Sequence, residues 1–280
     1  MYYAQRNNLL NDHNIHIDLD ELREYFFKIY KYFNNKKCFE VAFNGAYEED
    51  DYGRMKQVKS PLLKPSPDIF FLNHLNSMEI YPIDECYQWY TEKDLFTIIE
   101  ILYDNIGYYD FENSKFITEE PKEEFLEHIN NILKLYSDGY MLEKSNGFIM
   151  KIPNQAISEL LREDVSCIND DGIIEQMKSA TEKYYRFGST LDDKKGAIKI
   201  LADILEPLRE ELKKIFGTDL GVNKNIHDKL IFEIVNKFNI RHNDISQNKE
   251  YKKDVWYDWM MQYYTSVILT YYKLKISYNE

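Results

Sequence analysis

Residues 234–264 read IVNKFNIRHNDISQNKEYKKDVWYDWMMQYY. The stretch contains two strongly apolar segments, and the polar residues Arg241-His242-Asn243-Asp244 lie between them. Apolar residues that recur every three to four positions predict helices that bury one face against a neighbour. We therefore expect a helical bundle here, with proton-transferring and anion-binding side chains concentrated where two helices meet.

The sequence around this stretch, over the second half of the chain, predicts a mainly helical domain. Four segments have lengths typical of bundle helices, at Ile173–Phe187, Thr190–Phe216, Asn225–Ile240 and Asp254–Leu274, and a shorter helix is expected at Asn154–Glu163. Pro207 should kink the second of the four. The last is apolar around most of its circumference, which is typical of a helix in a bundle centre or at a dimer seam.

Helices and one hairpin are also expected in the first half. Helices should begin at Asp18 and at Thr91, where an acidic residue three positions on can complete a capping box, and a third should span Lys122–Tyr136. Residues 34–90 have a poor periodic signal and contain several prolines, which predicts turns and irregular chain.

The hairpin is predicted around Ser145-Asn146-Gly147, because Asn-Gly tolerates the positive φ angles of a tight turn. Its strands would be Tyr140–Lys144 and Phe148–Ile152, and Pro153 follows as a break. A length of 280 residues exceeds what one compact core usually needs. We predict a mainly α fold with an N-terminal helical domain containing the hairpin (residues 1–152) and a C-terminal bundle (residues 153–280).

Composition and charge exclude several classes of protein for this chain. The formal net charge is −13, which opposes broad binding to phosphate backbones but permits a small local positive site. Cys38, Cys86 and Cys167 are far apart, so neither a zinc site nor a disulfide framework is expected. The N-terminus lacks a secretory signal, and Asp258 and Gln262 interrupt the one long apolar run. We expect a soluble, cytoplasmic protein with no membrane span, cofactor or metal.

The Arg241 cluster can be read in two ways from its chemistry. Arginine grips phosphate with a fork of donors and histidine titrates near neutral pH, so Arg241 and His242 could hold and protonate a phosphodiester, with Asn243 or Asp244 orienting the imidazole. Alternatively, basic residues near a helix end complement the helix dipole, and Asn-Asp is ordinary turn chemistry. Residue chemistry alone favours the second reading.

A resemblance changes this balance. Residues 170–280 resemble a HEPN domain, a helical bundle of prokaryotic defence ribonucleases, in which an arginine followed by a polar residue opens an Arg-x(4 to 6)-His motif near a helix end. Arg241-His242 match the start of this motif. Residues 91–152, with YTEKDLFTIIEILYDNIG and INNILKLYSDGYMLEKSNGFIMKI, are similar to the N-terminal domain of AbiJ-type abortive-infection proteins. The chain departs from the motif because Ser246, Gln247 and Asn248 stand where its histidine belongs.

The resemblance implies an antiviral abortive-infection effector that acts as a dimeric, metal-independent ribonuclease on RNA. Arg241 would bind phosphate, with Asn243 or Gln247 assisting, and His242 would replace the missing histidine as acid and base. The alternative is a catalytically silent bundle that pairs with itself or binds a protein or nucleic-acid partner. In either case we expect a homodimer, with the N-terminal domain docking a protein partner or sensing a trigger.

Other candidate residues favour structural readings. Metal binding by His13 and His16 lacks a carboxylate at helix spacing. The acidic run 48–51 is typical of a solvated loop, and His74 and His128 are isolated. Tyr184, Tyr185 and Arg186 end a helix that could approach the Arg241 cluster. Aromatic residues that could stack bases are more typical of a core at their helical spacing, namely Trp256, Trp259, Tyr263 and Tyr264. A winged-helix reading of the hairpin half is opposed by the acidic helix Lys122–Tyr136.

Overall fold

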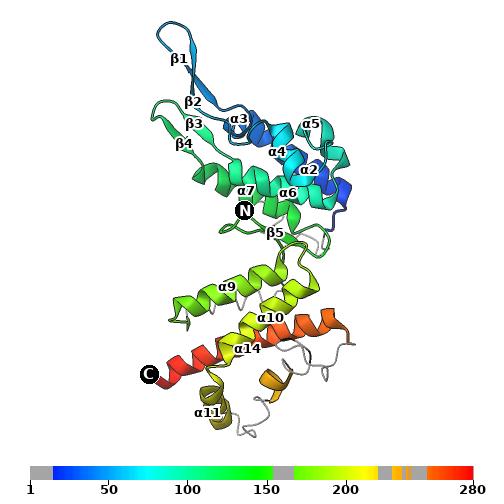
Figure 1. The fold of residues 1–280 in the computed structure, drawn as a ribbon, viewed down its shortest axis with the longest axis vertical. Helices are drawn as coiled ribbons and strands as arrows, with labels where there is room; N and C mark the ends of the chain where they lie inside the picture. The colour runs from blue at the N-terminus through cyan, green and yellow to red at the C-terminus, as the bar shows by residue number, and fades with distance from the viewer. Residues whose placement is uncertain are drawn as a thin grey trace, which may run out of the picture. The chain divides into compact units, whose positions relative to one another are not determined.

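A computed structural model describes residues 15–153, 167–219, 229–234, 238, 240 and 251–279. Internal contacts divide the chain into two compact units, Met1–Lys151 and Ile152–Glu280. Both are mainly helical, and the strands of the described residues form small antiparallel hairpins (Figure 1). In the described part of the chain, no helix is long and apolar enough to cross a membrane.

Helix α2 (Leu19–Asn35) opens the N-terminal unit and confirms the predicted capping box. The Asp18 carboxylate accepts from the backbone N–H of Glu21, and the Glu21 carboxylate accepts from that of Asp18. These two bonds satisfy backbone donors that a helix start otherwise leaves unpaired. One face of α2 is buried, through Leu22, Phe26, Tyr30 and Phe33.

Two further helices contribute to the core of this unit. Helix α6 (Glu92–Asn105) begins with the predicted capping box between Thr91 and Asp94. Helix α7 (Glu119–Leu133), which packs against α2, starts three residues before the predicted position and ends before Tyr136. Pro121 lies in its first turn, where the missing N–H of proline costs no helical hydrogen bond.

The hairpin predicted around Asn146-Gly147 is present, with shorter strands than expected. Strands β5 (Tyr140–Leu142) and β6 (Ile149–Lys151) pair antiparallel, with Met141 opposite Met150. Gly147 has φ +71° and donates its N–H to the carbonyl of Glu143 at 3.0 Å. The positive φ is the conformation for which the Asn-Gly pair was predicted.

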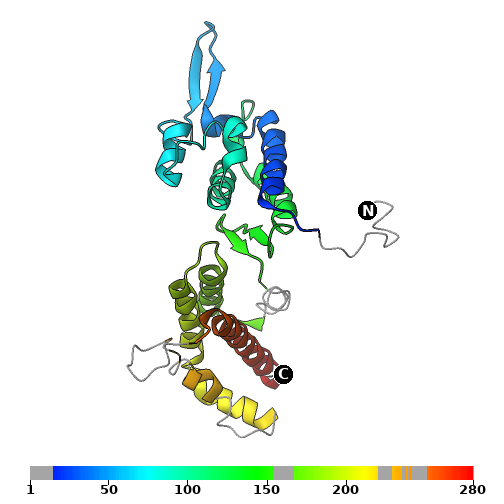
Figure 2. The same ribbon diagram turned by 90° about the vertical axis from the view of Figure 1, so that its right-hand side faces the viewer.

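Residues 34–90 are more regular than predicted, although the chain around Pro61, Pro65 and Pro82 is irregular, as expected. They form the elements α3 (Glu40–Phe43), β1 (Ala46–Glu49), β2 (Met55–Lys59), α4 (Pro67–Leu75), α5 (Ile83–Cys86) and η1 (Tyr87–Trp89). A further hairpin that was not predicted joins β3 (Tyr108–Asp110) to β4 (Lys115–Ile117). The β1–β2 hairpin projects from the helices of this unit (Figures 1 and 2). Strands with both faces in solvent lack the apolar alternation by which a strand is recognised.

The C-terminal unit is built on three helices that lie side by side in Figure 1. Helix α10 (Leu191–Leu205) packs against both α9 (Asp171–Tyr185) and α14 (Lys253–Asn279). The predicted Thr190–Asp193 capping box is present. Pro207 does not kink one long helix but separates α10 from α11 (Arg209–Asp219), because proline clashes with the preceding helical turn.

Two predicted helices of this unit lie wholly or mostly outside the described residues. These are Asn154–Glu163 and Asn225–Ile240, and of the latter the described part includes the π-helical turn η3 (Lys229–Glu233). Helix α14 is present and longer than predicted, and residues Met260, Tyr264 and Ile268 are fully buried. It is not buried all round, however, since Val255, Trp256 and Trp259 are exposed.

Candidate functional site

The predicted site residues Arg241, His242, Asn243 and Gln247 lie outside the described residues, as does Asp244. Their arrangement, and whether they come together, therefore stays a prediction. The described residues that flank them do have a defined geometry. Phe238 and Ile240 precede the segment 241–250, and Tyr251 follows it.

The two flanks of the segment contact each other at the start of α14. The hydroxyl of Tyr251 donates to the backbone carbonyl of Phe238 at 2.8 Å. The Phe238 ring lies edge-on to the Tyr251 ring at 4.8 Å between centroids, and 5.1 Å from the Trp256 ring. Ile240 is 2% exposed and belongs to the core of the unit. The described residues on the two sides of the segment 241–250 are thus in contact with each other.

A polar cluster that was not predicted is centred on Asp258 in the first turns of the same helix. Tyr184, at the end of α9, donates its hydroxyl to the Asp258 carboxylate of α14 at 2.5 Å. The Lys194 ammonium, from α10, lies 3.8 Å from that carboxylate and 5.0 Å from the centre of the Tyr184 ring. Burial and the hydrogen bond to Asp258 raise the pKa of Tyr184, so the phenol stays protonated at neutral pH.

This Tyr184–Asp258–Lys194 cluster joins three helices through one carboxylate. Tyr184 is 2% exposed, whereas the side chain of Asp258 is 56% exposed. The cluster therefore links the first turns of α14 to α9 and α10, and its carboxylate remains accessible to solvent. The sequence contained a signal for it, because Asp258 interrupts an otherwise apolar helix, but only packing could name its partners.

Among the other predicted candidates, His74 and His128 make local contacts. His13 lies outside the described residues and His16 is exposed. His74 has its Nδ1 atom 2.8 Å from the carbonyl of Phe70 in its own helix, and His128 lies edge-on to Tyr32. Among the described residues, no three His, Cys, Asp or Glu side chains form a group that could hold a metal ion.

The acidic run at 48–51 belongs to the β1–β2 hairpin and was predicted as a solvated loop. Glu48 and Glu49 are exposed, as predicted, but they belong to strand β1 and not to a loop. Asp50 closes the turn by accepting from the backbone N–H groups of Tyr52 and Arg54, both at 2.9 Å. These hydrogen bonds, with that from the Arg54 side chain, lower the pKa of Asp50. The run therefore shapes a turn.

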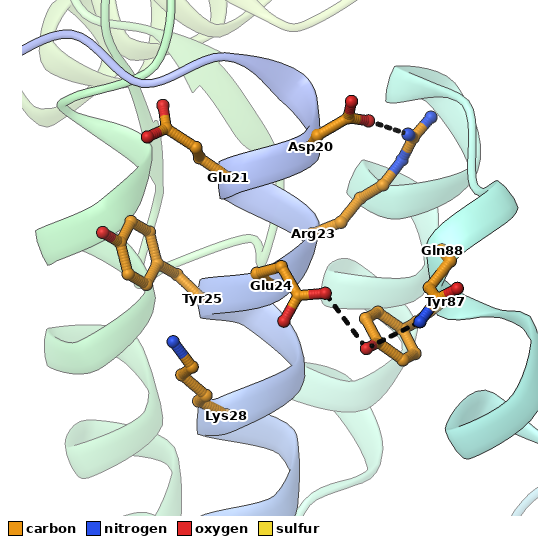
Figure 3. A pocket seen from close by; sticks show the side chains of 8 residues that line it. All are labelled: Asp20, Glu21, Arg23, Glu24, Tyr25, Lys28, Tyr87 and Gln88. Carbon is orange, nitrogen blue, oxygen red and sulfur yellow. Dashed lines mark hydrogen bonds and ion pairs between the residues drawn. The ribbon is translucent and has the colours of Figure 1, made fainter.

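A pocket of about 360 Å³ lies between α2 and η1 in the N-terminal unit (Figure 3). Arg23 donates its Nε–H to the carbonyl of Tyr90 at 2.6 Å and pairs with Asp20 at 2.5 Å. On the facing wall, Tyr87 donates to Glu24 at 3.1 Å and accepts from Gln88 at 3.2 Å.

These contacts give the pocket a structural explanation. The side chain of Arg23 is 17% exposed, and its guanidinium links α2 to Tyr90, the residue after η1. The ring of Tyr87 stacks on Phe27 at 3.9 Å with an interplanar angle of 3°. Arg23, Asp20, Glu24, Tyr87 and Gln88 are thus engaged in contacts that hold α2 against the chain at η1.

Comparison with known proteins adds no relative. No protein-family model, no curated protein and no solved structure matches this chain.

Proposed function

We propose that the C-terminal unit is a HEPN-like bundle that acts as a metal-independent ribonuclease in abortive infection, as a homodimer. Arg241 holds the scissile phosphate, His242 transfers protons, and Asn243 and Gln247 assist in phosphate binding. The proposal rests on the motif resemblance of Arg241-His242, which lies between two apolar helical segments.

One structural observation carries the proposal. The hydrogen bond from Tyr251 to Phe238 brings the two flanks of residues 241–250 together at the start of α14. This contact supports the proposal because it joins the residues that stand directly before and after the proposed site in the sequence. Preorganised positioning is the main requirement of a reaction whose catalysis depends on charge stabilisation and proton transfer.

The proposed reaction needs no external reactant. The ribose 2′-hydroxyl loses its proton to a base and attacks the adjacent phosphorus, and the bond from phosphorus to the 5′-oxygen breaks. The leaving oxygen takes a proton, and a 2′,3′-cyclic phosphate remains. General acid and base catalysis contributes roughly 10²- to 10⁴-fold to such a step. A pair of Arg241-His242 clusters facing each other in the dimer would supply both an acid and a base.

The N-terminal unit is proposed to dock a protein partner or to sense the trigger. Its projecting β1–β2 hairpin is consistent with that role, since Tyr47, Tyr52 and Met55 expose apolar surface there.

The test is an RNA-cleavage assay on the purified full-length chain with EDTA present throughout. We expect the parent to cleave RNA to products that end in a cyclic phosphate, and Arg241→Ala and His242→Ala to lose at least roughly a hundredfold in rate. Arg54→Ala and His74→Ala are matched controls, because they remove the same residue types from the N-terminal unit. Both controls should retain the parent rate.

The same assay decides against the alternative. The position of the missing downstream histidine holds Ser246, Gln247 or Asn248, which favours a catalytically silent bundle as the second candidate function. A parent that dimerises but leaves RNA intact, both alone and in extracts of phage-infected cells, would support that candidate. Cleavage that Arg241→Ala and His242→Ala leave unchanged would also refute the assigned roles.

A further inference from the structure

The chain contains two Asn-Gly pairs, Asn44-Gly45 and Asn146-Gly147. In this dipeptide the backbone nitrogen of the glycine can attack the side-chain amide of the asparagine, because glycine has no Cβ that would shield its nitrogen. The reaction expels ammonia and leaves an acidic residue. Since the two pairs have similar intrinsic reactivity, a large difference between them in the folded protein must come from structure.

The amide of Asn146 is fixed within the β5–β6 turn. Its Oδ1 atom accepts from the backbone N–H of Phe148 at 2.9 Å, and its own backbone N–H donates to the Glu143 carboxylate at 3.1 Å. Its Nδ2 atom is buried. The attacking nitrogen is also engaged, since Gly147 donates its N–H to the carbonyl of Glu143 at 3.0 Å. The turn must therefore open before the reaction can start.

Helix α6 opposes this opening. The hydroxyl of Tyr103 donates to the backbone carbonyl of Lys144 at 3.2 Å, and the Glu100 carboxylate accepts from the backbone N–H of Ile149 at 2.6 Å. A segment held by several tertiary hydrogen bonds opens rarely, because they must break together. The fold thus protects Asn146.

Asn44 is held by fewer contacts. It is exposed and follows the last residue of α3, directly before Gly45 and strand β1. Its Nδ2 atom donates to the carboxylate of Glu40, also exposed, at 3.1 Å. Gly45 donates its N–H to the carbonyl of Val41 at 3.2 Å. Exposed side chains change rotamer within nanoseconds, so the amide of Asn44 reaches reactive positions without the opening of a packed turn.

We propose that Asn44 is a site of spontaneous deamidation in the folded protein and that Asn146 is protected. A base from the solvent removes the proton of the Gly45 N–H, and this nitrogen forms a bond to Cγ of Asn44. The bond from Cγ to Nδ2 breaks, and the nitrogen leaves as ammonia after taking a proton from water. Water then opens the five-membered imide at either carbonyl. The product is aspartate, or isoaspartate when the backbone continues through the former side chain.

Both products disturb the base of the β1–β2 hairpin. Aspartate loses the donor to Glu40 and places a second carboxylate beside it, and like charges repel. Isoaspartate adds one methylene to the backbone directly before Gly45, where a Cβ would lie 2.6 Å from the carbonyl oxygen of Lys59. Lys59 is the partner of Ala46 in the first pair of the hairpin. The longer backbone therefore displaces β1 from β2. A resulting loss of partner docking rests on the proposed function, whereas the chemistry does not.

The experiment follows both sites in one sample of the full-length chain. The purified protein is incubated at mildly alkaline pH, and peptide mapping by mass spectrometry measures the converted fraction at each asparagine over time. We expect Asn44 to convert at least roughly tenfold faster than Asn146 in the folded protein. In urea the two rates should be similar, since neither site is then held. Equal rates in the folded protein, faster conversion of Asn146, or no conversion at Asn44 would overturn the proposal.

A variant of α7 tests whether the fold protects Asn146. The side chain of Asn130 donates to the carbonyl of Leu142 at 3.1 Å and accepts from its N–H at 2.7 Å, which holds strand β5. Asn130→Ala should speed the conversion of Asn146 at least roughly fivefold and leave that of Asn44 unchanged. Asn131→Ala is the matched control, because Asn131 is exposed and accepts from Lys134 at the end of the same helix. Equal rates in both variants would refute the protection.

Amide hydrogen exchange tests the consequence for the hairpin. Ion-exchange chromatography isolates the converted chains, because each carries one more negative charge. We expect faster exchange in their β1–β2 hairpin and unchanged exchange in β5–β6. Asn44→Gln should remove the converted fraction, since glutamine would have to close a larger ring, and Asn146→Gln should retain it. Unchanged exchange in the hairpin would refute its displacement. Formation of the same fraction by Asn44→Gln would overturn the assigned site.

Discussion

Helices α2 and α14 are both rich in aromatic residues but use them in opposite ways. In α2, charged residues alternate with aromatic ones, and Phe26, Tyr30 and Phe33 are buried together. In α14, apolar residues surround the helix, and Trp256 and Trp259 remain exposed. An amphipathic pattern predicts which face of a helix is buried. In a helix that is apolar all round, the packing of neighbouring elements determines the buried face.

The largest expected effect tests this difference directly. Phe33→Ala should destabilise the N-terminal unit by about 3–5 kcal/mol, because the ring is fully buried and its removal leaves a cavity. Val255→Ala on α14 should change the free energy of unfolding by less than about 0.5 kcal/mol. Urea denaturation monitored by circular dichroism measures both. Similar effects for the two variants would mean that the exposed face of α14 is covered in solution.

An intermediate effect is expected at the start of α10. Thr190→Ala removes the hydroxyl that accepts from the backbone N–H of Asp193 at 3.1 Å, which should cost about 1 kcal/mol of stability in the C-terminal unit. Thr190→Ser keeps a capping hydroxyl and should retain most of that stability. Thermal unfolding of both variants is the measurement, and equal losses would argue against the cap.

The smallest effect concerns the polar edge where α2 meets α7. The Glu124 carboxylate accepts from Lys36 at 2.6 Å and from Tyr32, and these hydrogen bonds lower its pKa from the usual 4.5. Because the folded pKa is the lower one, the stability that Glu124 contributes is present above pH 4.5 and is lost as the pH falls through the lowered pKa.

Replacing this carboxylate should therefore give a pH-dependent difference. We expect Glu124→Gln to lose up to about 1 kcal/mol near neutral pH and to match the parent in strong acid. Unfolding curves recorded from pH 7 down to pH 3 measure this, with the exposed Glu127→Gln on the same helix as the control. A difference that grows as the pH falls would contradict the expected sign.

Local signals accounted for the parts of the fold that were predicted correctly. Capping residues placed the starts of α2, α6 and α10, and Asn146-Gly147 placed the β5–β6 turn. The β1–β2 hairpin was missed because Tyr47 pairs with Gln57 and Glu48 with Lys56, so neither strand shows a buried apolar face. The break at Pro207 was predicted only as a kink, because a proline in the sequence does not show whether a helix bends or ends there.

For the candidate site too, the sequence predicted some features and packing decided others. Reactive residue types and motif spacing singled out Arg241 and His242, and their roles remain a prediction. Sequence also marked Asp258 as unusual in an apolar helix. It could not pair Asp258 with Tyr184, 74 positions earlier, or bring Phe238 to Tyr251, because these contacts arise from the packing of helices that are remote in sequence.

The sequence by itself determined that this chain is mainly helical, where most of its well-capped helices begin, and that its reactive side chains concentrate at residues 241–244. These are consequences of backbone hydrogen bonding and periodicity within a few turns of chain. The tertiary structure alone decided which face of α14 is exposed and which residues hold its first turns, because burial depends on the elements that pack alongside and not on the residues of one helix.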